Sequence, residues 1–218
     1  MNILAKIVRD KKVELSRTKK IKPLKSVQSA AERVPNPPSF AKAVVQRGKL
    51  SIIAEMKCKS PSAGTLIKDY HPGKLARLYK RSGASAISVL TEQKYFGGDL
   101  SHVREAASSS GLPVLRKDFV VDPYQIFESK AAGASCVLLI AGILTLPELK
   151  VLLHLAEKIG LDALVETHSA SEIAKTLKAG PSLVGINNRD LKTLTTDVET
   201  TFHLLGKVAG KAAVISES

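Results

Sequence analysis

The sequence is poor in the residues that mark several classes of protein. Its 218 residues include two cysteines, Cys58 and Cys136, and no tryptophan. Two cysteines so far apart cannot form the disulfide framework of a small secreted domain, so we expect a reducing, cytoplasmic location. The longest apolar run, around residues 137–144, is far too short to span a bilayer, and the first residues lack a secretory signal. We therefore expect no membrane association.

Metal and dinucleotide motifs are also lacking. The histidines stand alone without ligand spacing such as H-x-x-x-H, which predicts no metal site. No G-x-G-x-x-G follows the first predicted strand, and we expect no cofactor. Cys58 is interpreted as a spectator thiol and Cys136 as a core residue. The histidines are interpreted as surface or cap residues: His71, His102, His154, His168 and His203.

Positive charge is concentrated at one end. Residues 1–50 hold 13 Lys/Arg against 3 Asp/Glu, whereas residues 51–218 hold 20 against 17. The basic segment has no interleaved aromatics that would stack on bases, so we expect no nucleic-acid partner. Two interpretations of this charge stay open. It is either a solvated helix face or a basic cover that attracts an anionic substrate.

Hydrophobic periodicity divides the chain at residue 51. Residues 1–50 read as a basic helical extension, with helices predicted over 2–17, 23–33 and 40–45. Residues 51–218 alternate short apolar strands with amphipathic helices at intervals of roughly 20–35 residues, which is the rhythm of βα units. Strands are predicted over residues 51–57, 85–91, 113–117, 135–140, 163–166, 183–187 and 212–217.

Helix boundaries between these strands carry their own signals. Asp122 precedes Pro123 as a predicted N-cap. Three pairs match a capping box: Thr145 with Glu148, Ser169 with Glu172, and Thr196 with Glu199. Glycines stand where helices should end: Gly83, Gly111, Gly133, Gly160 and Gly180. Seven such units predict a (β/α)₈ TIM barrel with an N-terminal helical extension, lacking the last βα unit.

Charged side chains end alternate predicted strands. Lys57, Lys117, Glu166 and Glu217 follow the first, third, fifth and seventh apolar runs. Active sites of such barrels lie at the C-terminal strand ends, and alternate strands fill a common layer. We therefore expect these four side chains to face one another across one mouth. Two lysines and two glutamates without metal ligands suit proton transfer on a small anion.

Other interpretations remain. Each charge alone is explained by a solvated strand end. A class I aldolase would use Lys57 or Lys117 as a Schiff base. A further alternative is a non-catalytic remnant, or a binding module whose basic N-terminal segment takes anionic polymers.

At the strand ends the chain closely resembles the indole-3-glycerol-phosphate synthases of tryptophan biosynthesis. The resemblance covers nearly the whole chain and is carried by I-I-A-E-M-K-C-K-S-P-S (52–62), L-T-E-Q-K-Y-F-G-G (90–98), L-R-K-D-F (115–119), G-A-S-C-V-L-L-I (133–140), L-V-E (164–166), G-I-N-N-R-D-L (185–191) and S-E-S (216–218). It implies ring closure of 1-(2-carboxyphenylamino)-1-deoxyribulose 5-phosphate, with loss of carbon dioxide and water and with no cofactor or metal.

Residue roles follow from the same resemblance. Lys117 is the implied general acid, Lys57 holds the substrate carboxylate, and Glu166 is the base in dehydration. Implied substrate-binding residues are Glu55, Ser60, Ser88, Phe96, Phe119, Leu138, Asn187, Arg189, Glu217 and Ser218. The implied partner is a small phosphorylated substrate. The implied assembly is a monomer, with association with other enzymes of the tryptophan pathway left open.

One departure from the family concerns phosphate binding. The sequence stops at Ser218, where the family continues with a glycine, a helix, a strand and a helix. Phosphate in these barrels is held by backbone N–H groups after the last two strands. We therefore expect the 218-residue chain alone to be marginally stable and essentially inactive.

Overall fold

Helices form the N-terminal part of the chain. The computed structural model describes residues 3–46, 48–61, 63–189 and 195–218. The first helices are α1 (Ile3–Ile21), α2 (Leu24–Glu32) and α3 (Phe40–Val44), which confirms the three predicted segments. In α1, residues four apart (Ile7, Lys11 and Leu15) are buried, because this spacing places them on one helix face. Helix α2 packs on α7.

A curled parallel sheet of seven strands follows, in the order β1-β4-β5-β6-β7-β8-β9. The strands are β1 (Ile53–Met56), β4 (Ala86–Leu90), β5 (Val114–Lys117), β6 (Cys136–Ile140), β7 (Asp162–Thr167), β8 (Leu183–Asn187) and β9 (Ala213–Glu217). All seven predicted strands are confirmed. The first of them is followed by a short antiparallel hairpin that the periodicity did not indicate, β2 (Lys59–Ser60) with β3 (Gly64–Thr65).

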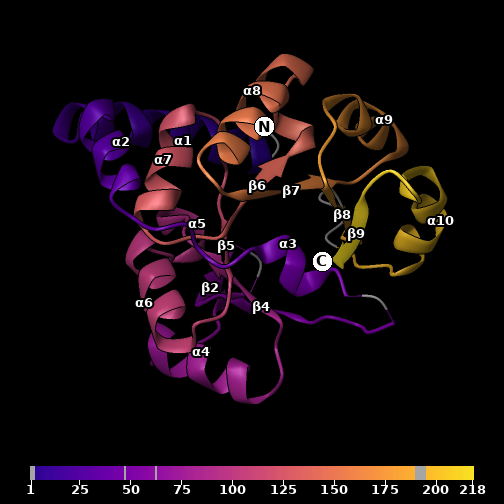
Figure 1. The fold of residues 1–218 in the computed structure, drawn as a ribbon, viewed down its shortest axis with the longest axis horizontal. Coiled ribbons are helices and arrows are strands. Elements are labelled where there is room, and N and C mark those ends of the chain that lie inside the picture. Colours follow the sequence, from indigo (N-terminus) through magenta and orange to yellow (C-terminus); the bar gives the residue numbers. More distant parts are fainter. Residues whose placement is uncertain (1–2, 47, 62, 190–194) are drawn as a thin grey trace.

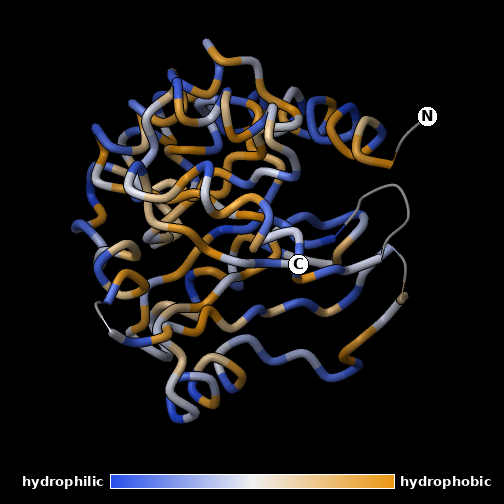
Figure 2. Tube along the Cα trace, turned by 90° about the vertical axis from the view of Figure 1, so that its right-hand side faces the viewer, coloured by the Kyte–Doolittle hydropathy of each residue, from blue (hydrophilic) through white to orange (hydrophobic). Residues whose placement is uncertain are grey.

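Helices cover the outer face of this sheet (Figure 1). They are α4 (Pro72–Arg81), α6 (Leu100–Ser110), α7 (Pro123–Ala131), α8 (Leu146–Lys158), α9 (Ala170–Ala179) and α10 (Glu199–Val208), with the short α5 (Gln93–Phe96) and a 3₁₀ turn at Ala141–Ile143. Polar and apolar segments alternate along them (Figure 2), as expected of amphipathic helices on a sheet. The arrangement is that of a TIM-like barrel. No described helix has the length and hydropathy needed to cross a membrane.

The predicted caps are confirmed at some helices and wrong at others. Thr145 and Glu148 form a reciprocal capping box. Ser169 accepts from the Glu172 amide, but the Glu172 carboxylate accepts from the His168 amide, so only half of that box exists. The box predicted from Thr196 is wrong. Helix α10 begins at Glu199, and Asp197 accepts from the Glu199 amide, because the Asp197 carboxylate lies closer to the first turn.

The inner face of the sheet is apolar at its N-terminal end. Phe40 of α3 is fully buried there among inward side chains such as Leu115, Leu164 and Leu183. Asp162, at the start of β7, holds α3 in place by accepting from the Ala41 amide (2.9 Å) and the Ser39 hydroxyl (3.1 Å). Helix α3 thus closes the N-terminal end of the sheet, and the polar groups lie at its C-terminal end.

Candidate active site

A cavity of about 610 Å³ opens at the C-terminal strand ends. Strands β1, β4, β5, β6, β7 and β8 supply its floor, and Ile3, Leu4 and Ile7 of α1 cover one side. Of the predicted site residues, eleven line the cavity: Glu55, Lys57, Ser60, Phe96, Lys117, Phe119, Leu138, Glu166, Asn187, Arg189 and Ser218. Two predicted residues, Ser88 and Glu217, are not among its lining. Ser62 and Asp190–Leu191 of the quoted motifs lie outside the described residues.

Of the four strand-end charges, Lys117 and Glu217 are in direct contact, Glu55 links Lys117 to Lys57, and Glu166 acts on Lys117 electrostatically. Lys117 Nζ lies 3.0 Å from Glu217 Oε2 and 3.2 Å from Glu55 Oε2. Lys57 Nζ lies 2.7 Å from Glu55 Oε1. Parallel strands explain this convergence, because their C-terminal ends lie together and every second side chain points inward. Asn187 at the end of β8, for example, pairs with Glu217 at the end of β9.

Lys117 is held as an ammonium. Burial by itself lowers its pKa, but the carboxylates of Glu217, Glu55 and Glu166 outweigh burial and raise it above the usual value. The Lys117 side chain keeps 17% exposure toward the cavity. An ammonium with this exposure can donate a proton to a bound ligand.

Glu217 lies below this lysine. Burial raises its pKa to about 7, against the opposing effect of Lys117. Its Oε1 is buried and accepts no hydrogen bond within the described residues. A Cβ at Gly185 would collide with this oxygen, so a larger residue there would push the end of the Glu217 side chain aside. Glu217 therefore supports Lys117 from beneath the cavity.

The pKa of Glu55 is lowered, in contrast to the raised pKa of Glu217. Burial raises it, but Lys117 and Lys57 together lower it below the usual value. Glu55 is thus an anion between two cations. It orients both lysines.

Glu166 is buried and contacts two further side chains. Asn187 Nδ2 donates to Glu166 Oε1 at 3.1 Å, and His168 Nε2 lies 3.3 Å from the same oxygen. The prediction that every histidine is a surface or cap residue is wrong for His168, whose side chain is 16% exposed. Residues 166 and 168 share one face at the end of β7. That spacing was visible in the sequence.

Apolar groups form the cavity wall. The rings of Phe96 and Phe119 lie with centroids 6.2 Å apart at an angle of 34°, and Leu138 lies on the inner face of β6. Ser88 lies on the sheet at the level of Leu115, buried, and its hydroxyl has no hydrogen-bond partner among the described residues. The cavity thus has an apolar wall for an aromatic ring beside a charged floor.

Comparison with known proteins identifies the family. A family model described as Indole-3-glycerol phosphate synthase matches residues 4–218. The protein of that name from Thermoanaerobacter sp. (strain X514) is 42% identical over 216 residues, which cover 99% of this chain and 82% of that protein. This chain belongs to the indole-3-glycerol phosphate synthase family.

Other synthases give the same result. The synthase of Carboxydothermus hydrogenoformans is 41% identical over 223 residues, covering 99% of this chain and 84% of its own. The synthase of Polaromonas naphthalenivorans is 40% identical over 220 residues, covering 100% and 84%. The family is one of lyases in tryptophan biosynthesis.

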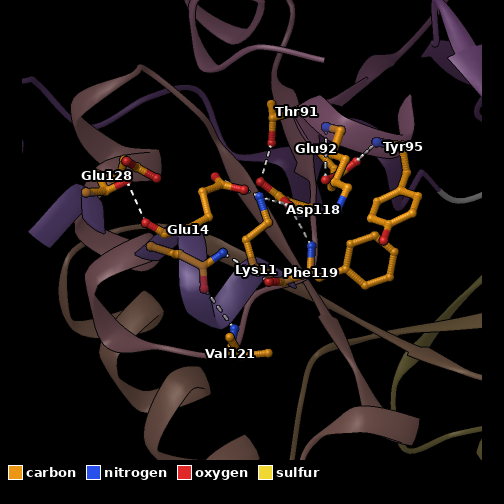
Figure 3. Close-up of polar contacts among 12 residues, drawn as sticks. Lys11, Glu14, Thr91, Glu92, Tyr95, Asp118, Phe119, Val121 and Glu128 are labelled. Atoms are coloured by element: carbon orange, nitrogen blue, oxygen red, sulfur yellow. Dashed lines mark hydrogen bonds and ion pairs between the residues drawn. The ribbon is translucent and has the colours of Figure 1, made fainter. Parts of the chain in front are cut away.

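Beside the cavity lies a buried charge network, of which the K-D-F motif was a part (Figure 3). Asp118 accepts from Thr91 Oγ1 (2.7 Å), Arg116 Nη2 (2.9 Å) and the Phe119 amide (2.8 Å). Thr91 and Arg116 donate to Oδ2, whereas the Phe119 amide donates to Oδ1, and Lys11 Nζ of α1 lies 3.3 Å from Oδ1. Asp118 stands between Lys117 and Phe119, so the network fixes the turn from which both enter the cavity. The K-D-F motif was its only sequence signal.

The hairpin loop is tied to α5 beside the cavity. The Cys58 thiol donates to the carbonyls of Phe96 (3.3 Å) and Gly97 (3.1 Å), and Lys59 Nζ donates to the Lys94 carbonyl (2.9 Å). Cys136 is fully buried, as predicted. Among the described residues, no three His, Cys, Asp or Glu side chains gather as a metal ligand set.

Proposed function

We propose that this cavity converts 1-(2-carboxyphenylamino)-1-deoxyribulose 5-phosphate into indole-3-glycerol phosphate through proton transfers by Lys117 and Glu166. The observation that carries the proposal is Lys117, a buried ammonium held by Glu55 and Glu217 at the cavity floor. Membership in the synthase family supports it. The substrate is then a small phosphorylated anion whose aromatic ring lies against Phe96, Phe119 and Leu138.

Lys117 acts first. As the ring carbon of the substrate attacks the ribulose carbonyl carbon, the carbonyl oxygen gains charge and takes a proton from Lys117 Nζ. The carbon that forms the new bond then loses its carboxylate as carbon dioxide, and the electron pair left behind restores the aromatic ring. Lys57, 29% exposed and held by Glu55, binds that carboxylate until it leaves.

Glu166 acts in the dehydration. The hydroxyl formed in the first step leaves as water after it takes a proton from a lysine ammonium at the cavity floor. Glu166 accepts the proton that the neighbouring ring carbon, next to the nitrogen, loses as the double bond forms, which completes the pyrrole. Asn187 and Arg189 orient the sugar hydroxyls, with Ser60 and Ser218 at the cavity edge.

A Schiff-base aldolase is less compatible with these contacts. A Schiff-base lysine attacks as a neutral amine, so it needs a lowered pKa. Glu217 and Glu55 instead keep Lys117 charged. Borohydride in the presence of a ketone substrate should therefore leave Lys117 unmodified, and covalent trapping there would favour the aldolase.

The finer architecture belongs to the same proposal. The curled sheet has β1 and β9 at its edges in the described part of the chain. We take its strands as seven of an eight-stranded barrel, with residues 1–50 as an extension over its ends.

Glu166→Gln tests the chemistry. The variant should lose at least about a hundredfold in kcat with KM nearly unchanged, because the amide has the same shape and cannot take a proton. Formation of indole-3-glycerol phosphate is the measurement. If only KM changes, Glu166 is a binding residue and the base lies elsewhere.

A further inference from the structure

We propose that His168 is a positioning residue for Glu166. It lies just beyond the end of β7, on the same face as Glu166, and its Nε2 is 3.3 Å from Glu166 Oε1. Asn187 Nδ2 donates to that same oxygen at 3.1 Å. The two groups together hold one carboxylate oxygen and leave Oε2 to take the proton. The inference rests on the proposed role of Glu166 as a base.

The imidazole has a second anchor on its other side. Its Nδ1 lies 3.5 Å from Glu172 Oε2, and that oxygen also accepts the His168 amide proton at 2.8 Å. Glu172 belongs to the first turn of α9, whose start is capped by Ser169. The ring is therefore fixed between a carboxylate on a helix and a carboxylate in the cavity, with both nitrogens facing acceptors.

Two facing acceptors select the doubly protonated ring. A neutral imidazole has one N–H and cannot donate to both Glu166 and Glu172. Burial lowers the pKa of His168, but Glu172, Glu166 and Glu217 outweigh burial and raise it. The nearest lysines interact electrostatically with the two carboxylates that face the imidazole. Lys117 faces Glu166, and Lys175 faces Glu172.

The burial of the ring indicates a role beyond folding. His168 Nε2 is buried, and among the described residues it has no aligned hydrogen bond, although Glu166 lies within ion-pair distance. Hydrogen bonds of catalytic groups often tighten only when substrate is bound. His168 Nε2 is therefore placed to form a hydrogen bond with Glu166 that shortens when substrate binds.

Kinetics of three variants test the inference. His168→Ala should lower kcat by about tenfold and change KM by less than about twofold, because a lost charged hydrogen bond acts on Glu166 and not on substrate binding. His168→Gln should recover most of kcat, since its amide can donate to Glu166. The matched control is His154→Ala, an exposed histidine on α8, which should change neither constant.

The pH profile separates positioning from mere packing. The wild-type kcat should decline as pH rises through the raised pKa of His168, where the ring loses the proton it gives to one carboxylate. In His168→Gln this decline should be absent, because an amide does not titrate. An identical profile in the two proteins would overturn the inference.

A double variant shows whether His168 acts through Glu166. In a Glu166→Gln background, adding His168→Ala should change the residual kcat by less than about twofold. A further tenfold loss, or a raised KM with unchanged kcat in the single variant, would overturn the inference. If Glu166→Gln itself leaves kcat unchanged, the proposed function fails instead.

A titration independent of turnover completes the test. The NMR signal of the His168 ring should report a pKa above that of a free histidine, lowered in Glu172→Gln and in Glu166→Gln. An unshifted pKa in both variants would show that the ring does not interact with these carboxylates, and the inference would fail whatever the kinetics.

Discussion

Consecutive residues of β5 carry two cations with different surroundings. Arg116 points away from the cavity and is paired with Asp118 (2.9 Å) and Glu128 (2.8 Å), with 5% exposure. Lys117 points into the cavity and is paired with Glu55 and Glu217, with 17% exposure. Both are buried ion pairs. The difference is that a ligand can reach only the lysine.

This comparison distinguishes a structural charge from a functional one. Burial raises the cost of both charges, and both keep their protons because carboxylates outweigh that cost. The partners of Arg116 come from the same segment of chain, Asp118 and Glu128, and are fixed by the fold. Those of Lys117 come from β1 and β9, far apart in sequence, and they meet only at the cavity.

The largest effect should come from Arg116→Met. Removing Arg116 leaves Glu128 without its cation and Asp118 with Lys11 alone, which should lower the free energy of unfolding by about 3–5 kcal/mol. Chemical denaturation measures the loss. The matched control is Lys117→Met, which should cost less because the cavity admits water to the carboxylates left behind. Equal losses would break the comparison.

Lys117→Met should have the next largest effect, on catalysis. We expect kcat to fall by at least about a hundredfold, or about 2.7 kcal/mol, because the carbonyl oxygen loses its proton donor. Steady-state kinetics is the measurement. Turnover at the wild-type rate would remove Lys117 from the role of general acid.

A smaller effect concerns pH and Glu217. The pKa of Glu217 in the folded protein, about 7, is higher than its ordinary value of 4.5, so between these pH values the folded state binds a proton that the unfolded state has lost. The contribution of Glu217 to stability is therefore complete below pH 4.5 and is lost as pH rises through 7. The slope is at most about 1.4 kcal/mol per pH unit. Unfolding of wild type and Glu217→Gln between pH 4.5 and 8 should differ by this slope, and parallel curves would contradict it.

The smallest expected effect is that of a chelator, which should leave turnover unchanged. In the proposed mechanism the cations at the strand ends are the lysines of the chain itself. Turnover measured in excess EDTA, with and without added divalent ions, is the check. A loss restored by metal would mean that charge at the cavity floor does not come from Lys117 and Lys57 alone.

Sequence periodicity and strand-end charges determined most of the fold and much of the candidate site. Apolar runs followed by Lys117, Glu166 and Glu217 predicted parallel strands with charges at one end, because the C-terminal ends of parallel strands lie together. The contact of Lys117 with Glu217 followed from that geometry, whereas Glu55 was predicted as a site residue from the family resemblance. The capping signal was ambiguous at the start of α10, where both Thr196 and Asp197 stand in the sequence as possible caps.

Only the tertiary structure decided which polar residues become partners across elements. Lys11 meets Asp118 because α1 lies against the end of β5, and His168 meets Glu166 and Glu172 because the chain turns into α9 there. Phe40 fills the apolar end of the sheet through the same kind of long-range packing. Sequence spacing reports on neighbours along a strand or helix, whereas these contacts depend on how whole elements pack, which no local pattern encodes.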